Sequence, residues 1–280
     1  MNAPARPAAP PRSPEAAAAS AVRLRGVSKS FVRGEARALV LDAVDLQIRP
    51  GEATFLVGPS GSGKTTLLSI IGCVLTPDAG AVEVLGRDVR RLNRSQIAAL
   101  RRREIGFIFQ RMHLIRGLTA LENVCVPLKL SGWRAAASRR RGLELLAAVG
   151  LADRADDNPA RMSVGQCQRI ALARALAADP ALVLADEPTA SLDAETGRTA
   201  IDLLRRTTVM LGKTLIVVTH DHRILHFADR VIAVEQGRLR EQLPSASREA
   251  LEAAAHGSSA SAAVELRLDC TTHLGPPAGL

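Results

Sequence analysis

The sequence predicts an α/β fold in which helices cover a mostly parallel β-sheet. Short apolar runs that suit buried strands alternate with helical segments, and this alternation indicates parallel strands. One such run, at 53–57, is followed at 58–65 by a complete phosphate-binding pattern, G-x-x-x-x-G-K-[ST]. With 280 residues, 47% of them hydrophobic, the chain can form one large domain or two small ones.

The elements are expected in a regular order along the chain. From Val22 to about Ile48, short segments of alternating polarity suit antiparallel strands. Between about 95 and 165 the periodicity is mainly helical, and one helix is expected to end at Gly150. The remaining runs predict strands at 53–57, 82–85, 181–185, 215–219 and 231–234, and helices at 66–71, 168–178 and 195–211.

The two ends of the chain differ in composition from this region. Residues 1–21 are mostly Ala and Pro, which predicts a disordered extension or an upstream start-site artefact. Residues 241–280 are rich in Ala, Ser and Gly and predict a mostly disordered tail, with a short helix around Arg248 to Ala255. A single domain is therefore expected at 22–240.

Composition argues against several classes of protein. The four cysteines form no CxxC pair, which disfavours a zinc site or a disulfide framework and favours a reduced cytosolic protein. No apolar stretch approaches the ~18 residues that span a bilayer, so a soluble or peripheral protein is expected. The formal charge is +9, but the arginine clusters at 101–103 and 139–141 lack interleaved aromatic residues that could stack on bases. We therefore expect no nucleic-acid partner, while a lipid-facing role for these clusters stays open.

Each position of the phosphate-binding loop has a physical role. Its glycines let successive backbone N–H groups point at a polyphosphate. Lys64 reaches the β- and γ-phosphates, and the Thr65 hydroxyl can coordinate Mg²⁺. The helix that begins at Thr66 adds a positive dipole end. We expect the chain to bind a nucleoside triphosphate through Gly58, Pro59, Ser60, Gly61, Ser62, Gly63, Lys64, Thr65 and Thr66.

Two carboxylates follow a second buried run. The strand expected at 181–185 delivers Asp186 and Glu187 at its carboxyl end, where open α/β sheets bind their ligands. Asp186 would hold Mg²⁺ through water, and Glu187 would orient and polarise an attacking water. On its own this pair could be a polar strand end before Pro188. Downstream of a complete phosphate-binding loop, it predicts a hydrolytic site.

Further segments stand in an order and spacing that one family shares: 105–110, which ends in Gln110; 163–166; 191–193; and His220. From about Val22 to Arg240 the chain resembles the ATP-binding subunit of ABC transporters. The resemblance implies a P-loop NTPase (RecA-like) core with a mostly parallel sheet. It also implies an N-terminal antiparallel β subdomain and a helical signature subdomain at about 95–165.

The resemblance implies ATP and Mg²⁺ as ligands and assigns roles around them. Phe31 looks like the aromatic residue that stacks on adenine. Gln110 looks like the residue that contacts Mg²⁺ and water and senses the membrane partner. His220 resembles the switch histidine, which holds the γ-phosphate and helps to fix Glu187. Lys64, Glu187 and His220 would then be the catalytic residues.

The resemblance also implies a homodimer in the ATP state. Ser163, Gly165 and Gln166 look like the signature loop, which binds the γ-phosphate held by the other subunit. Asp193 resembles the residue that ties the two composite sites together. A helix N-terminus that cannot reach its own chain's nucleotide makes ATP the adhesive of a symmetric dimer.

The signature loop departs from the family pattern Leu-Ser-Gly-Gly-Gln at two positions. Met162 replaces Leu, and Val164 replaces the first Gly. A β-branched residue is poorly suited to a positive φ, so this position raises the question whether the loop still functions. Ser163 and Gly165, which should contact the phosphate, are intact, and our hypothesis is that the loop works with altered turnover.

Several runs narrow the resemblance further. Residues 109–115, 118–124 and 185–193 are similar to the lipoprotein-release and macrolide-export branch, and 219–230 to its DevA-type glycolipid exporters. That branch implies a separate membrane permease, often with a periplasmic adaptor, at the cytoplasmic face of the inner membrane. The cargoes are lipids, lipoproteins or hydrophobic drugs. Residues 111–123, with apolar Leu114, Ile115 and Leu118, are expected to form the groove that receives the permease's coupling helix.

Other functions stay open from the sequence. A division-type cassette of the same branch would signal to cell-wall enzymes instead of exporting a cargo. A non-transport ABC ATPase would act on DNA or ribosomes, although the tandem cassettes, coiled coils or zinc insertions usual in that class are missing here. A nucleotide-gated protein without catalysis is disfavoured by Glu187 and His220. The sequence of this chain does not determine which cargo is transported, because this subunit does not contact the cargo.

Overall fold

The structure is a computed structural model that describes residues 20–33 and 36–242. Its strands are β1 (Val22–Arg33), β2 (Ala36–Ile48), β3 (Ala53–Val57), β4 (Ala79–Val84), β5 (Arg87–Asp88), β6 (Ile105–Ile108), β7 (Leu182–Asp186), β8 (Thr214–Val218), β9 (Arg230–Glu235) and β10 (Arg238–Gln242). Its α-helices are α1 (Lys64–Ile71), α2 (Arg94–Glu104), α3 (Ala120–Leu130), α4 (Ala135–Ala148), α5 (Val164–Leu176) and α6 (Ala194–Thr208).

A six-stranded sheet forms the centre of the described chain, in the order β10-β9-β3-β8-β7-β6. The pairs β9/β3, β3/β8, β8/β7 and β7/β6 are parallel, and β10 pairs antiparallel with β9. The strands β3 and β8 are buried along their whole length, as expected for a sheet that is covered on both faces. The expected parallel α/β fold is therefore confirmed.

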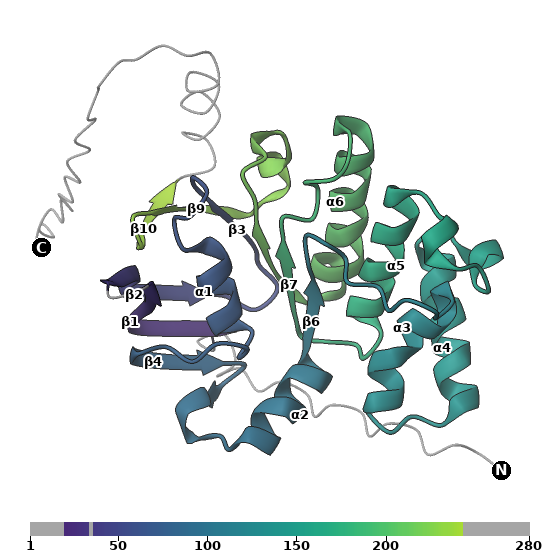
Figure 1. The fold of residues 1–280 in the computed structure, drawn as a ribbon, viewed down its shortest axis with the longest axis horizontal. Coiled ribbons are helices and arrows are strands. Elements are labelled where there is room, and N and C mark those ends of the chain that lie inside the picture. The colour runs from purple at the N-terminus through teal and green to yellow at the C-terminus, as the bar shows by residue number, and fades with distance from the viewer. Residues whose placement is uncertain (1–19, 34–35, 243–280) are drawn as a thin grey trace, which may run out of the picture.

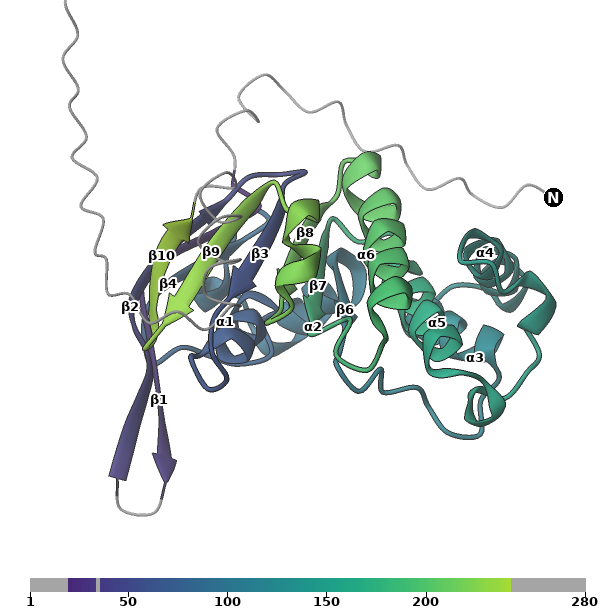
Figure 2. The same ribbon diagram turned by 90° about the horizontal axis from the view of Figure 1, so that it is seen from above.

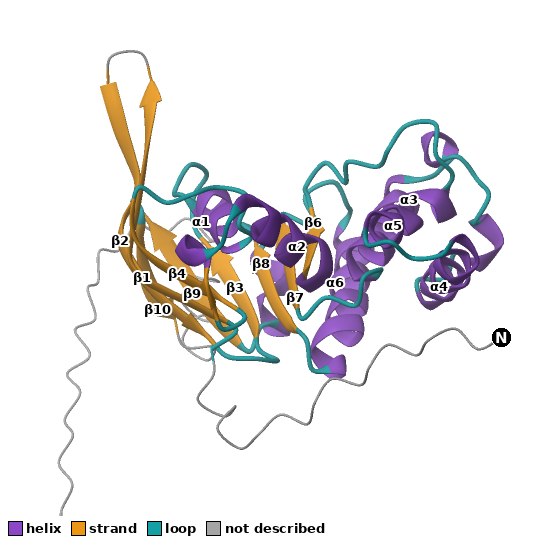
Figure 3. Cartoon of the chain, turned by 90° about the horizontal axis from the view of Figure 1, so that it is seen from below, coloured by secondary structure: helices purple, strands orange, loops and turns teal. Residues whose placement is uncertain are grey.

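A second, antiparallel sheet packs beside the first, in the order β2-β1-β4-β5. The helix α1 lies between the two sheets, and its Leu67 and Ile70 join one apolar cluster with both of them (Figure 1). The outer parts of β1 and β2 project away from the body (Figure 2). The helices α3, α4 and α5 gather on the opposite side of the molecule from this hairpin (Figure 3).

The helical side has its own close contacts. Leu121, Val124 and Leu128 of α3 and Leu145 and Leu146 of α4 are buried in a cluster that continues under the central sheet. The helices α3 and α4 approach closely at Gly142, where an added Cβ would lie 2.6 Å from Leu121 Cδ1 and 2.8 Å from Cys125 Sγ. A glycine inside α4 is therefore required by packing, despite its poor helix propensity.

The structure differs from the sequence-based expectations in three places. The strand β6 lies inside the range expected to be helical, and α2 before it contacts this strand. Ser20 and Ala21, expected within a disordered extension, are buried, and Ala21 N donates to Ile48 O at 2.8 Å. The strand β10 follows the last strand expected, at 231–234, and it ends at Gln242, beyond the expected domain end at residue 240. The expected helix at 248–255 and the remainder of both ends lie outside the described residues.

Within the described residues, no helix combines the length and the apolar character that crossing a bilayer requires.

Asp78, just before β4, fastens the base of the β1–β2 hairpin. Its carboxylate accepts hydrogen bonds from Lys29 Nζ at 2.7 Å, Ser30 N at 2.8 Å and an Arg37 guanidinium N–H at 3.2 Å. These bonds, first of all the one from Lys29, lower the pKa of Asp78 to about 2. The ionised carboxylate therefore stabilises the folded hairpin.

Replacing Asp78 with Asn should make the stability of the chain less sensitive to acid. Because the folded pKa of about 2 lies below the ordinary value of 3.8, the carboxylate stabilises the fold above about pH 4. That contribution is lost as the pH falls through about 2. Urea unfolding at about pH 7 and about pH 3 measures the difference. The variant should lose stability mainly at the higher pH, whereas the exposed control Asp153→Asn should follow the wild type.

Candidate active site

One pocket collects most of the residues that the sequence analysis selected. It has a volume of about 560 Å³ and lies at the carboxyl edge of the central sheet. Because parallel strands end at the same edge, the loops after β3, β6, β7 and β8 meet there. The residues that line it are Phe31, Val40, Ser60, Gly61, Gly63, Lys64, Thr65, Thr66, Gln110, Glu187 and His220.

The loop between β3 and α1 is shaped to hold an anion. Gly58 has φ 145°, and a Cβ there would lie 2.2 Å from Val234 O, so only glycine fits. Gly63 precedes α1 without any side-chain cap, which leaves N–H groups of the first turn for a ligand. The hydroxyl of Ser62 is buried and has no hydrogen-bond partner among the described residues. These unpaired groups fit a polyphosphate.

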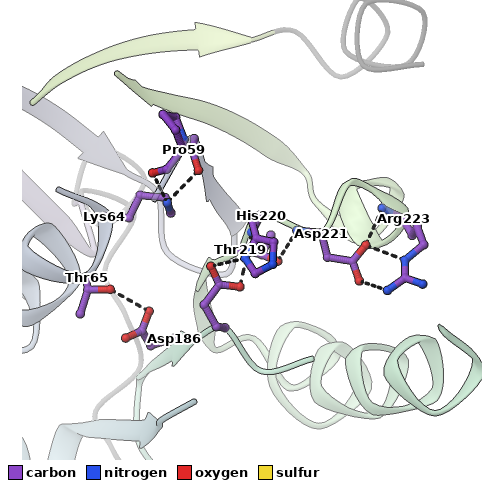
Figure 4. Close-up of polar contacts among 10 residues, drawn as sticks. Pro59, Lys64, Thr65, Asp186, Thr219, His220, Asp221 and Arg223 are labelled. Atoms are coloured by element: carbon purple, nitrogen blue, oxygen red, sulfur yellow. Dashed lines mark hydrogen bonds and ion pairs between the residues drawn. The ribbon is translucent and has the colours of Figure 1, made fainter. Parts of the chain in front are cut away.

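Lys64 lies beneath this loop, with 7% of its surface exposed. Its ammonium group donates to Gly58 O and Pro59 O, each at 2.8 Å (Figure 4). An ammonium group has three donors, so one more is available for a phosphate oxygen. Burial lowers the pKa of Lys64, while the charges of Glu187 and Asp186 raise it. The loop thus holds the cation in place through its own carbonyl groups.

Thr65 and Asp186 bring two oxygen ligands together. Thr65 Oγ1 donates to Asp186 Oδ1 at 3.1 Å (Figure 4). Burial raises the pKa of Asp186, and the hydrogen bond from Thr65 opposes this. Gln110, in the loop after β6, lines the same pocket with a side-chain carbonyl oxygen. Hydroxyl, carboxylate and amide oxygens are the ligands that Mg²⁺ prefers, so this set fits the ion.

Glu187 directly follows β7 and meets His220 across the end of the sheet. Its backbone has φ 48°, and its N–H donates to Val218 O at 2.8 Å, which fixes the turn. The carboxylate is 13% exposed, and its Oε1 lies 2.8 Å from His220 Nδ1. The imidazole N–H can therefore orient this carboxylate toward the pocket.

The loop that carries His220 is held by residues to which the sequence analysis gave no role. Thr219 is fully buried, and its hydroxyl accepts from Asp221 N at 2.9 Å. The Asp221 carboxylate accepts from Arg223 Nε at 2.8 Å, and the hydrogen bonds from Arg223 lower its pKa (Figure 4). Asp221 also caps the 3-10 helix His222–Phe227. The sequence signal for this role is an Asp directly before a short helical turn, because an Asp side chain accepts a hydrogen bond from the backbone N–H two residues further on.

Phe31 reaches the pocket from the β1–β2 hairpin. Phe31 is 38% exposed, and the centroid of its ring lies 5.7 Å from Lys29 Nζ. Val40 of the adjacent strand lines the same wall. The sequence analysis did not select Val40, because nothing in the chemistry of its side chain marks a binding residue.

The signature residues lie outside this pocket. Ser163 caps α5 by accepting from Gln166 N at 3.2 Å, and Gln166 Oε1 accepts from Ser163 N at 2.9 Å. Asp193 caps α6, because its carboxylate accepts from the backbone N–H groups of Glu195 and Thr196. None of the four residues Ser163, Gly165, Gln166 and Asp193 lines the pocket that contains Lys64.

The backbone at Val164 does not adopt the positive φ that would strain a β-branched residue. Val164 is the first residue of α5 and is not among the residues with positive φ. A β-branched residue is tolerated in this right-handed conformation, so the loop carries no strain of the expected kind. The Val164 side chain is 49% exposed.

Replacing Val164 with Gly should therefore change the ATPase rate by less than about tenfold, because glycine in a helix costs only about 0.5–1 kcal/mol. Steady-state ATPase assays of both chains measure this. If the wild type lacks turnover and Val164→Gly hydrolyses ATP, the loop as it stands is inactive.

A phosphate-binding loop followed by a Mg²⁺-type carboxylate and an oriented glutamate defines a nucleotide-hydrolysing P-loop protein. The family model described as "ABC transporter" matches residues 41–190. The chain belongs to this family, and it is an ATPase of the ATP-binding cassette type.

Two relatives support the assignment of the chain to one branch of this family. The chain is 44% identical over 218 residues to the macrolide export ATP-binding/permease protein MacB 1/2 of Paracoccus denitrificans, which covers 78% of this chain and 32% of the relative. It is 41% identical over 235 residues to the lipoprotein-releasing system ATP-binding protein LolD of Xanthomonas oryzae pv. oryzae, covering 84% of this chain and 96% of the relative. The chain thus spans about a third of the MacB relatives' length. The predicted lipoprotein-release and macrolide-export branch is confirmed, while the finer likeness to DevA-type exporters stays a prediction.

A solved structure supports the fold. The dimeric post-hydrolysis state of the ATP-binding cassette MJ0796, bound to ADP and Pi, has a TM-score of 0.74 and 41% sequence identity. The match covers 79% of this chain and 97% of that one. The predicted P-loop core with its antiparallel and helical additions is confirmed.

Proposed function

We propose that this chain is the ATP-hydrolysing subunit of an ABC exporter, that it forms a homodimer in the ATP state, and that it drives a separate membrane permease. The observation that carries the proposal is the split between the pocket and the signature residues. Lys64, Thr65, Glu187 and His220 surround one pocket, whereas Ser163 caps a helix outside it. A second copy would have to complete the site.

The residues of the pocket divide the chemistry among them. Phe31 stacks on the adenine, and Lys64 with the loop N–H groups holds the β- and γ-phosphates. Bound Mg²⁺, held by Thr65, Asp186 and Gln110, would neutralise phosphate charge. Glu187 accepts a proton from the attacking water as the water oxygen bonds to the γ-phosphorus and the bond to the ADP oxygen breaks. His220 holds Glu187 in position for this.

The signature residues supply the other half of the site. The capped N-terminus of α5 presents backbone N–H groups and the positive end of the helix dipole. In a symmetric dimer, this end of one copy faces the γ-phosphate bound by the other, with Ser163, Gly165 and Gln166 in contact and Asp193 between the sites. Loss of the γ-phosphate removes the bridge, and the dimer loosens.

The permease would dock in an apolar groove between α2, β6 and the end of α3, which we call the α2–α3 groove. Its volume is about 550 Å³, and its apolar wall includes Val74, Phe109, Ile115 and Leu130. These four side chains are 37–66% exposed. The groove shares the loop after β6 with the pocket, because Phe109 and Gln110 are adjacent. Movement of Gln110 can therefore reach the permease.

This groove differs in part from the one expected from the sequence. Ile115 lines it, but Leu114 and Leu118 do not, and Leu114 packs against the core instead. Met112 and His113 before them have φ 51° and 46°, so the chain direction changes there. Charge substitutions that test docking therefore belong at Ile115 and Leu130.

The remaining parts of the proposal concern location and cargo. The LolD relative is named as an ATP-binding protein of a lipoprotein-releasing system, and the MacB relatives as combined ATP-binding/permease proteins for macrolide export. By similarity to these relatives, the chain would act at the cytoplasmic face of the inner membrane, in the export of a lipid, a lipoprotein or a hydrophobic drug. A periplasmic adaptor would complete such a system.

Affinity purification of the full Glu187→Gln chain with ATP, from detergent-solubilised native membranes, tests the transporter proposal. We expect a polytopic permease with a large periplasmic domain to co-purify, since the trapped ATP state should hold its partner. The same chain without ATP is the control for nucleotide dependence, and the same chain with Ile115→Glu is the control for the groove. Recovery of ribosomes, of DNA-repair proteins or of no membrane protein would contradict the proposal.

A further inference from the structure

The α2–α3 groove carries positive charge that no carboxylate balances. Arg101 and Arg102 of α2, Arg174 of α5 and His113 lie along it, and none of the residues that line it is acidic. In the part of the chain that the structure describes, none of the three arginines is within ion-pair distance of a carboxylate. The groove therefore combines a largely apolar surface with a positive electrostatic potential.

Two of these arginines are engaged with neutral backbone carbonyl groups. An Arg101 N–H donates to Cys73 O at 2.9 Å. Arg174 donates to Met112 O at 2.5 Å and to His113 O at 2.7 Å, which holds the loop after Gln110 against α5. These bonds satisfy donors but leave the positive charges uncompensated.

Arg102 differs from both. Its Nε is buried, and this N–H has no hydrogen-bond partner among the described residues. A buried donor without a partner destabilises a protein and is rare in native structures, so an acceptor from a bound molecule would be favourable here. Of the three arginines that line the groove, Arg102 is thus the one with a buried donor left without an acceptor in the described part of the chain.

The identity of that acceptor follows from what docking would do to the groove. An apolar segment seated against Phe109, Ile115 and Leu130 would exclude water from Arg102. A neutral occupant would leave the guanidinium desolvated without a counter-charge, which is unfavourable. A carboxylate pairs with a guanidinium through two parallel hydrogen bonds and compensates its charge.

We infer that the permease segment in the α2–α3 groove is an amphipathic helix whose apolar face bears one Asp or Glu, and that this carboxylate pairs with Arg102. An apolar groove of this kind receives a helix through anchors spaced three or four residues apart, so the carboxylate occupies one such position. The inference rests on the proposed function, because that function supplies the membrane partner. It adds the chemistry by which the partner is selected.

The test is site-specific photo-cross-linking in native membranes. The full chain carries p-benzoyl-phenylalanine at Leu130, which is 66% exposed on the groove wall, and is irradiated with ATP present. Mass spectrometry then identifies the cross-linked peptide. The experiment is repeated with Arg102→Glu and with the matched control Arg103→Glu, which makes the same charge change at an exposed residue of α2 that does not line the groove.

We expect the cross-link to fall on a cytoplasmic segment of a polytopic membrane protein, with an Asp or Glu within one helical turn. Arg102→Glu should reduce the yield at least about tenfold, whereas Arg103→Glu should retain it. Changing the partner's carboxylate to Arg should restore the yield with Arg102→Glu.

Three results would overturn the inference while leaving the proposed function intact. These are a docked segment without a carboxylate, equal losses with both arginine variants, and a permease that still docks after its carboxylate is changed to Ala. Cross-links only to lipid or to a second copy of the chain would overturn the inference and the groove assignment. The absence of any membrane protein, here and in the affinity purification, would overturn the proposed function itself.

Discussion

Replacing Glu187 with Gln should lower steady-state ATP hydrolysis by about 100- to 10,000-fold, the range for loss of a positioned general base. The amide keeps the size of the side chain but cannot accept the proton of the attacking water. The Glu187 side chain is 13% exposed, and its Oε1 lies 2.8 Å from His220 Nδ1, so this carboxylate is held in one position. Phosphate release at saturating ATP measures the effect.

ATP binding by the same variant should remain, because Glu187 is not part of the phosphate-binding loop. The matched control is Glu195→Gln, which makes the same change at an exposed residue in the first turn of α6 and should keep wild-type turnover. Turnover by Glu187→Gln within tenfold of the wild type would show that another group activates the water.

Replacing Lys64 with Ala should weaken ATP binding roughly 10- to 150-fold, because hydrogen bonds to charged groups contribute about 1.5–3 kcal/mol. The effect should exceed that of any other single contact in the loop, since Lys64 is the buried cation beneath the phosphates. Burial lowers its pKa, but the charges of Glu187 and Asp186 oppose this shift. Calorimetric titration with ATP and Mg²⁺ measures the loss.

The control for this change is Lys129→Ala, an exposed lysine in the last turn of α3. It removes the same charge far from the loop in sequence and should leave ATP binding unchanged. Equal binding by Lys64→Ala and the wild type would mean that the nucleotide is held elsewhere.

The sequence predicted the pocket well because strand ends determine it. The phosphate-binding loop, Asp186, Glu187 and His220 each follow a short apolar run, and the carboxyl ends of parallel strands meet at one edge. Once the runs are recognised as parallel strands, residues more than a hundred positions apart are placed together. No knowledge of side-chain packing is needed for this step.

The parts that the sequence did not predict depend on contacts between distant segments. The strand β6 directly follows α2 and has only four residues, too few for a periodic signal. Of the three apolar residues expected in the groove, Ile115 lines it, but Leu114 and Leu118 do not. Met112 and His113, just before them, have positive φ, which interrupts any periodicity. The significance of Arg102 depends on a buried atom without a partner, and composition alone does not reveal it.

The most direct test of the composite site is to mix two inactive chains. Glu187→Gln keeps an intact signature loop, and Gly165→Asp keeps an intact pocket but places a negative charge where the signature should contact the γ-phosphate. A heterodimer of the two contains one complete site, formed by the pocket of the Gly165→Asp chain and the signature loop of the Glu187→Gln chain. We predict that an equal mixture recovers up to about a quarter of wild-type ATPase activity, although each chain alone is inactive. Activity of the mixture no greater than the sum of the separate chains would contradict the account, because the catalytic site would then be complete within a single chain.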